Sequence, residues 1–245
     1  MPSDPPLPPG PPDLPSGPAP EPPPAARVHE LTSGEWIAQA LGAAAELGVA
    51  DQLASGPLAV EKIAEAVGAD APSLHRLLRP LADVGVFEEL DGGRRYALTP
   101  VGRLMRGGTP DSMRDWARLI GLPAHRAAWT GLAEAVRTGV PAFDQVHGQP
   151  GFDYFRDHPE EGDVLDGAMN AVSAQFSALV AETYDFSGLG TVVDVGGGRG
   201  ALIAAVLTRN PGVRGILFDL PHVIAGAGGP LREAGVEDRC RLVGG

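Results

Sequence analysis

The segment VVDVGGGRGA, residues 192–201, is the strongest indication of the fold class. Its first half is a β-branched run typical of a buried parallel strand, and four glycines follow within residues 196–200. Glycine adopts positive φ and has no Cβ, so such a loop lets the backbone approach a nucleotide-like ligand closely. The segment GALIAAVLTRNPG, residues 200–212, then predicts a helix whose unpaired N-terminal N–H groups face this loop.

Two more strands are predicted after this helix. RGILFDL, residues 214–220, and RCRLV, residues 239–243, are apolar and short, and the mostly helical segment 221–236 separates them. The order strand, helix, strand, helix, strand is that of the first half of a doubly wound parallel sheet. We therefore expect an α/β fold of the Rossmann-like class, with an incomplete parallel sheet in residues 185–245.

Two carboxylates accompany the glycine loop. Asp219 ends the second predicted strand, 23 residues after Gly196, where a carboxylate can accept both hydroxyls of a ribose. Asp194 precedes Gly196 by two residues, so its charge would repel a pyrophosphate and attract a cationic amino group. The loop spacing by itself also fits a dinucleotide fingerprint, or a tight turn that binds no ligand.

Residues 27–110 form a different module. Helical spacing over residues 35–54, 58–70 and 71–85 is followed by two short strands about an Asp-Gly-Gly turn. Three helices and a hairpin are the pattern of a winged helix, which could bind DNA through its third helix. The alternative is a module that packs this helix internally and serves dimerisation.

The charge of the chain favours the second alternative. His75, Arg76 and Arg79 are the basic or titratable residues that a DNA-reading helix would use, but the net charge is −12. Non-specific affinity for nucleic acid comes from Lys and Arg that neutralise phosphates. We therefore expect no nucleic-acid partner, and for the same reason no binding to anionic membrane surfaces.

The rest of the chain is assigned by composition and periodicity. Residues 1–26 contain 13 of the 25 prolines and are expected to form a disordered tail. Residues 111–184 are expected to be connecting helices, over 111–140 and roughly 160–184, with a polar Pro- and Gly-rich loop at 141–163 between them. Cys240 is the single cysteine, which excludes a disulfide or a Cys-based zinc site within one chain. Without a signal-peptide pattern or a membrane-span pattern, cytoplasmic localisation is expected.

Taken together, "VVDVGGGRG" and "ILFDLPHVI" resemble the two-domain O-methyltransferases that use S-adenosylmethionine (SAM), including plant caffeate-type and bacterial natural-product enzymes. The resemblance runs from about Val28 to the last residue. It implies a dimerisation role for the winged-helix-like module, a homodimer, and a small aromatic or polyketide-like hydroxyl as methyl acceptor. It also implies that the connecting helices of residues 111–184 line the acceptor side.

The resemblance also implies roles for individual residues. Gly196 would lie under the methionine part of SAM, near Gly198 and Asp194, and Asp219 would hold the ribose. Leu220 would lie beside the adenine. In the helix containing LDGAMNAVSAQF, Met169 would contact the acceptor and Ser173 the cofactor carboxylate. Val172 stands where plant relatives often carry His, so the plant acceptor contacts are not transferred.

The resemblance ends with the chain. The acidic residue that contacts adenine in this family, and the His that acts as general base, would both follow Gly245. No catalytic residue is therefore assigned, and His222 is interpreted as structural. We expect a truncated chain with impaired activity, since a general base alone is worth ~10²–10⁴-fold in rate. The alternatives are a non-catalytic dimerisation partner and a winged-helix regulator with a vestigial ligand domain.

Overall fold

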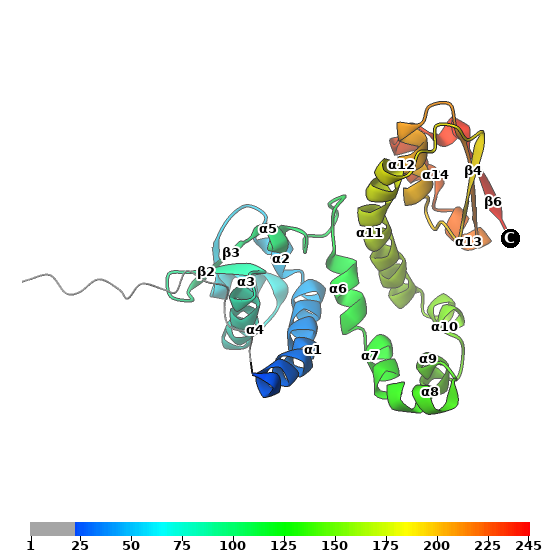
Figure 1. Cartoon of the computed structure of the whole chain (residues 1–245). Coiled ribbons are helices and arrows are strands. Elements are labelled where there is room, and N and C mark those ends of the chain that lie inside the picture. Colours follow the sequence, from blue (N-terminus) through cyan, green and yellow to red (C-terminus); the bar gives the residue numbers. More distant parts are fainter. Residues whose placement is uncertain (1–22) are drawn as a thin grey trace, which may run out of the picture. The chain divides into compact units, whose positions relative to one another are not determined.

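The computed structural model describes residues 23–245 (Figure 1). Most of the predicted tail, residues 1–26, therefore lies outside the described residues. Helix α1 spans Pro24–Glu46 and includes the last three residues of that predicted tail, so the helix begins earlier than expected. Backbone contacts divide the described residues into two units, which meet in the sequence between Gly34 and Glu35. In the first unit, Arg27 and Glu30 form an ion pair of 2.7 Å along the helix surface.

The second unit begins with a small module of helices and antiparallel strands. Its elements are α2 (Val49–Gln52), β1 (Leu58–Ala59), α3 (Val60–Val67), α4 (Ala71–Asp83), β2 (Phe87–Leu90), β3 (Arg95–Leu98) and α5 (Pro100–Arg103). The strands pair in the order β1-β3-β2, and Phe87 lies opposite Leu98 in the predicted hairpin. The Asp70 side chain caps α4 by accepting the Ser73 N–H at 3.0 Å. The predicted helices and hairpin are therefore present in the expected order, and their assignment to a winged helix stays a prediction.

The apolar face of α4 is packed inside this module. Leu74, Leu78 and Leu81 are at most 2% exposed. Between them His75 turns its Nδ1 to the hydroxyl of fully buried Tyr96 on β3, at 2.9 Å. His75 is therefore a structural partner of the hairpin rather than a free basic group on the helix surface.

A series of helices follows this module: α6 (Arg114–Gly121), α7 (Pro123–Thr130), α8 (Leu132–Thr138), α9 (Ala142–His147), α10 (Gly151–Asp157) and α11 (Pro159–Thr183). The helix expected over roughly 160–184 is present as α11. The prediction of a loop at 141–163 is wrong, because α9 and α10 occupy most of it. Its Pro and Gly residues mark helix ends: Pro141 and Pro150 precede α9 and α10, and Gly148 ends α9 at φ 73°. Phe143 of α9 contacts the ring of Tyr154 of α10 at 5.3 Å between centroids, so tertiary packing holds these short helices.

The last part of the chain has the predicted alternation of strands and helices. Its elements are β4 (Thr191–Val195), α12 (Ala201–Arg209), β5 (Arg214–Asp219), α13 (Pro221–Ile224), α14 (Gly228–Glu233), a 3-10 turn (Glu237–Arg239) and β6 (Cys240–Gly244). The strands are parallel in the order β4-β5-β6, with Val193 opposite Ile216 and Leu217 opposite Leu242. The parallel α/β sheet is therefore confirmed.

Helices α12 and α14 pack on one face of this sheet (Figure 1). Ile203, Leu207, Leu217 and Leu231 form the core there and are at most 1% exposed. The alternate residues of β4 point to the other face, where Val193 and Val195 are 54% and 73% exposed. Within residues 23–245, no helix is both long and apolar enough to cross a membrane.

Candidate cofactor site at the glycine loop

The glycine loop joins the carboxyl end of β4 to the start of α12. Gly196, Gly198 and Gly200 have φ values of 69°, 62° and 88°, a backbone region that side chains strongly disfavour. At Gly200 a Cβ would also lie 2.9 Å from Leu217 Cδ2 of β5. The path of this loop therefore requires glycine at these positions.

Two hydrogen bonds hold the loop against the end of β5, and a third, between neighbouring residues, orients the Asp219 carboxylate. The Gly196 N–H donates to the Phe218 carbonyl oxygen at 2.8 Å. The Gly198 N–H donates to Asp219 Oδ2 at 2.8 Å, and the Leu220 N–H donates to Asp219 Oδ1 at 2.6 Å. A carboxylate has about four acceptor positions, so two remain for further donors. The structure thus brings Gly196, Gly198, Asp219 and Leu220 together at the carboxyl edge of the sheet.

Asp194 lies beneath the loop. A Cβ on Gly197 would be 2.6 Å from Asp194 Oδ2, so the carboxylate is packed directly under the loop backbone. This oxygen is buried and has no hydrogen-bond partner in the structure. Burial is the main cause that raises the pKa of Asp194, and the nearby charge of Asp219 raises this pKa further. A hydrogen bond from the Ile203 N–H lowers it. The site therefore holds a partly compensated negative charge below the glycines.

The helix α11 brings a further polar side chain to the loop. Asn170 Oδ1 lies 3.9 Å from the position that a Cβ on Gly198 would take. Ser173 is exposed and follows three residues later, so it is the neighbour of Asn170 on the helix surface. Met169 is 45% exposed and lies about 100° around the helix from Asn170.

A cavity of about 590 Å³ adjoins this arrangement, between the segment that includes α6, the helix α11 and the start of α12. Asn170, Arg199 and Ala201 line it on the side of the loop. Sequence reasoning did not single out Asn170 or Arg199. Two signals could have found them: Arg199 lies inside the glycine motif, and Asn170 is one helical turn from Ser173.

Comparison with known families agrees with this geometry. Residues 129–245 match the family model of the O-methyltransferase domain, and residues 29–107 match that of the O-methyltransferase dimerisation domain. The two matches together cover the described module of antiparallel strands and the parallel sheet with its glycine loop.

Individual relatives point the same way. The chain is 44% identical over 216 residues to the phenazine O-methyltransferase PhzM of Lysobacter antibioticus, which covers 88% of this chain and 63% of that protein. The crystal structure of LaPhzM superimposes with a TM-score of 0.85 at 43% identity, covering 91% of this chain and 67% of that one. Human N-acetylserotonin methyltransferase in complex with SAM superimposes with a TM-score of 0.80 at 26% identity, over 94% and 68% of the two chains.

A parallel sheet with a glycine loop held by an acidic residue, preceded by a dimerisation module, defines the class of two-domain methyltransferases. The chain belongs to the O-methyltransferase family that has this dimerisation domain. It spans about 63% of the length of the Lysobacter relative.

Proposed function

We propose that the protein is a SAM-dependent methyltransferase that acts on a hydroxyl of a small aromatic or polyketide-like metabolite. The observation that carries this proposal is the hydrogen bond of 2.8 Å between the Gly198 N–H and Asp219 Oδ2. It places a carboxylate with free acceptor positions beside a loop whose backbone is open to a ligand.

The adenosine end of SAM fits the end of β5. Asp219 uses one position of each oxygen for the Gly198 and Leu220 N–H groups, and the remaining positions suit the two ribose hydroxyls. Leu220 is 45% exposed and offers an apolar surface to the adenine.

The methionine end fits the glycine loop and α11. Gly196 and Gly198 leave room for the ligand because they carry no Cβ. Asp194, with its buried Oδ2, supplies negative charge below the loop and favours a cationic amino group at short range. Ser173 is the exposed hydroxyl on α11 that would donate to the cofactor carboxylate.

The acceptor would lie against Met169, whose side chain is 45% exposed on α11. When bound, SAM supplies an electrophilic methyl group on a sulfonium. The protein aligns the acceptor oxygen with it, and alignment is a large part of catalysis in such a displacement. An aromatic amine is the alternative acceptor, because its lone pair can attack the same carbon. The dimerisation domain supports a homodimer as the working form.

The first test is a calorimetric titration of the 245-residue chain with SAM, beside the variants Asp219→Ala and Asp238→Ala. We expect micromolar binding that Asp219→Ala abolishes. Asp238 is exposed and lies in the 3-10 turn before β6, so its variant should bind normally. A folded wild-type chain that does not bind SAM would refute the proposal.

The second test measures methyl transfer from labelled SAM to matched hydroxy- and aminobenzoates. Transfer to the hydroxyl compounds alone would support an O-methyltransferase, and transfer to the amines alone would shift the acceptor to nitrogen. Binding of SAM without transfer to either set would favour a non-catalytic dimerisation partner.

A further inference from the structure

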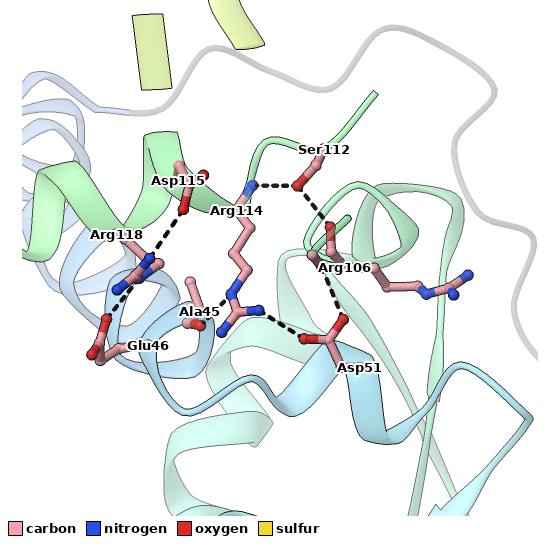
Figure 2. A network of polar contacts seen from close by, with 9 residues as sticks. Ala45, Glu46, Asp51, Arg106, Ser112, Arg114, Asp115 and Arg118 are labelled. Carbon is pink, nitrogen blue, oxygen red and sulfur yellow. Dashed lines mark hydrogen bonds and ion pairs between the residues drawn. The ribbon is translucent and has the colours of Figure 1, made fainter. Parts of the chain in front are cut away.

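The helix α6 is attached to the preceding module by a network of polar contacts (Figure 2). Arg114 forms an ion pair of 2.9 Å with Asp51 Oδ2 on α2, and its Nε donates to the Ala45 carbonyl oxygen of α1 at 3.0 Å. The other oxygen of Asp51 accepts the Gly107 N–H at 2.9 Å. These bonds fix the start of α6 and the segment before it to α1 and α2.

One turn later, Arg118 extends the same network. Its Nε lies 2.8 Å from Glu46 Oε2 on α1, and its Nη1 lies 3.1 Å from Asp115 Oδ1 on α6 itself. Arg114 and Arg118 both line the 590 Å³ cavity, but carboxylates already neutralise their charges. They therefore hold α6 in place, and we assign the cavity no anionic ligand.

On its other side α6 meets α11 at a glycine. A Cβ on Gly167 would collide with Asp115 Oδ2, and it would lie 2.9 Å from Cγ and 3.0 Å from Cβ of the same residue. Gly167 lies inside the 25-residue helix α11, where alanine would favour the helix more than glycine does. Glycine therefore makes α11 less stable at the position where Asp115 packs against it.

We propose that Gly167 is a positioning residue. Its missing side chain lets Asp115, held by Arg118, seat against α11, and this contact sets where Asn170 and Ser173 stand relative to the glycine loop. The inference rests on the proposed function, since it concerns binding of the amino-acid end of SAM. It extends that function by making the dimerisation module, through α6, a determinant of cofactor binding.

The test compares two probes on the full 245-residue chain: S-adenosylhomocysteine, and 5′-methylthioadenosine, which lacks the amino-acid end. In Gly167→Ala we expect about tenfold weaker binding of S-adenosylhomocysteine and less than twofold change for methylthioadenosine. The double variant Gly167→Ala/Asp115→Ala removes the colliding carboxylate and should bind S-adenosylhomocysteine about threefold more weakly than wild type, as expected for the loss of the Asp115 contact alone. Gly229→Ala in α14, where a Cβ would meet nothing within 4 Å, is the matched control and should bind both probes normally.

Each other outcome is decisive. If Gly167→Ala binds S-adenosylhomocysteine with the same affinity as wild type, the inference is overturned and the proposed function stands. Equal weakening of both probes also overturns it, because a general structural defect would do that. If Gly167→Ala does not fold, Asp115→Ala alone must bind S-adenosylhomocysteine about threefold more weakly with methylthioadenosine binding unchanged, and an unchanged affinity for S-adenosylhomocysteine overturns the inference. A wild-type chain that binds neither probe refutes the proposed function and this inference together.

Discussion

The backbone N–H of Gly198 donates to Asp219 Oδ2 over 2.8 Å, joining two residues 21 positions apart in the chain. The same carboxylate accepts the Leu220 N–H through Oδ1. Asp219 is therefore a structural anchor of the glycine loop as well as the proposed partner of the ribose. Its two roles can be separated by measuring stability and binding on the same variants.

Replacing Asp219 should cost stability even without a ligand. Asp219→Ala removes both acceptors, and hydrogen bonds to a charged group are worth about 1.5–3 kcal/mol, so we expect the free energy of unfolding to fall by roughly that amount. Asp219→Asn keeps one acceptor oxygen and should lose less. Urea unfolding at pH 7 measures both, with Asp238→Ala as the control. Equal stability of all three variants and wild type would show that the loop does not depend on this carboxylate.

Replacing Asp194 should have the opposite effect and increase the stability of the fold at neutral pH. Burial raises the pKa of Asp194 above the ordinary value of 3.8. The protonated carboxyl therefore stabilises the folded state fully below pH 3.8, and this stabilisation is lost as the pH rises through the raised pKa. At pH 7 the charged group therefore destabilises the fold. Asp194→Asn should raise the free energy of unfolding at pH 7, and this gain should vanish below about pH 4, where the wild-type carboxyl is protonated.

The same Asp194→Asn variant should bind S-adenosylhomocysteine more weakly, because the negative charge below the loop is gone. Chemical unfolding across pH 3–8 and calorimetry at pH 7 check the two parts. A variant that is less stable than wild type at pH 7 would contradict the assigned cost of this buried charge.

The effects of replacing Arg114 and Asp51 on the free energy of unfolding should be coupled. Both side chains are about one quarter to one third exposed, and they meet at 2.9 Å. We expect a coupling free energy of roughly 1 kcal/mol from a double-mutant cycle with Arg114→Gln and Asp51→Asn, followed by urea unfolding. The exposed pair Arg137–Glu134 is the control and should give less than about 0.5 kcal/mol. Equal coupling in the two pairs would mean that the network of Figure 2 adds no more than a surface ion pair.

Tyr96 should remain protonated at alkaline pH. Burial raises its pKa from 10.0 to about 12, so its contribution to stability is present below pH 10 and is lost as the pH rises toward 12. Tyr96→Phe lacks this dependence but also loses the hydrogen bond to His75. We expect the variant to be about 1 kcal/mol less stable at pH 8.

The difference between Tyr96→Phe and wild type should narrow by roughly 1 kcal/mol at pH 11. Unfolding at the two pH values measures this change, and the other titrating groups cancel because both proteins carry them. A constant difference would place the hydroxyl in contact with water rather than in the core.

Local patterns were enough for the order of elements in the last part of the chain. The β-branched run of β4, the glycine loop and the apolar α12 follow one another directly, so strand, loop and helix are all encoded within residues 191–209. Where aromatic contacts between separate helices decide the structure, local patterns mislead. Pro and Gly at 141–163 predict a loop, yet they lie at the ends of α9 and α10, which Phe143 and Tyr154 hold together.

The class of the fold and the composition of the glycine loop follow from local sequence, because positive φ and a close backbone approach admit little besides glycine. Local sequence also indicates Asp194 and Asp219 as site residues, because each lies near the carboxyl end of a predicted strand. Three contacts became evident from the packed structure: Asp219 accepts the Gly198 N–H, Asn170 faces the loop, and Asp115 packs on Gly167. These are contacts between segments distant in the chain, and they depend on how helices and strands pack, which no local spacing specifies.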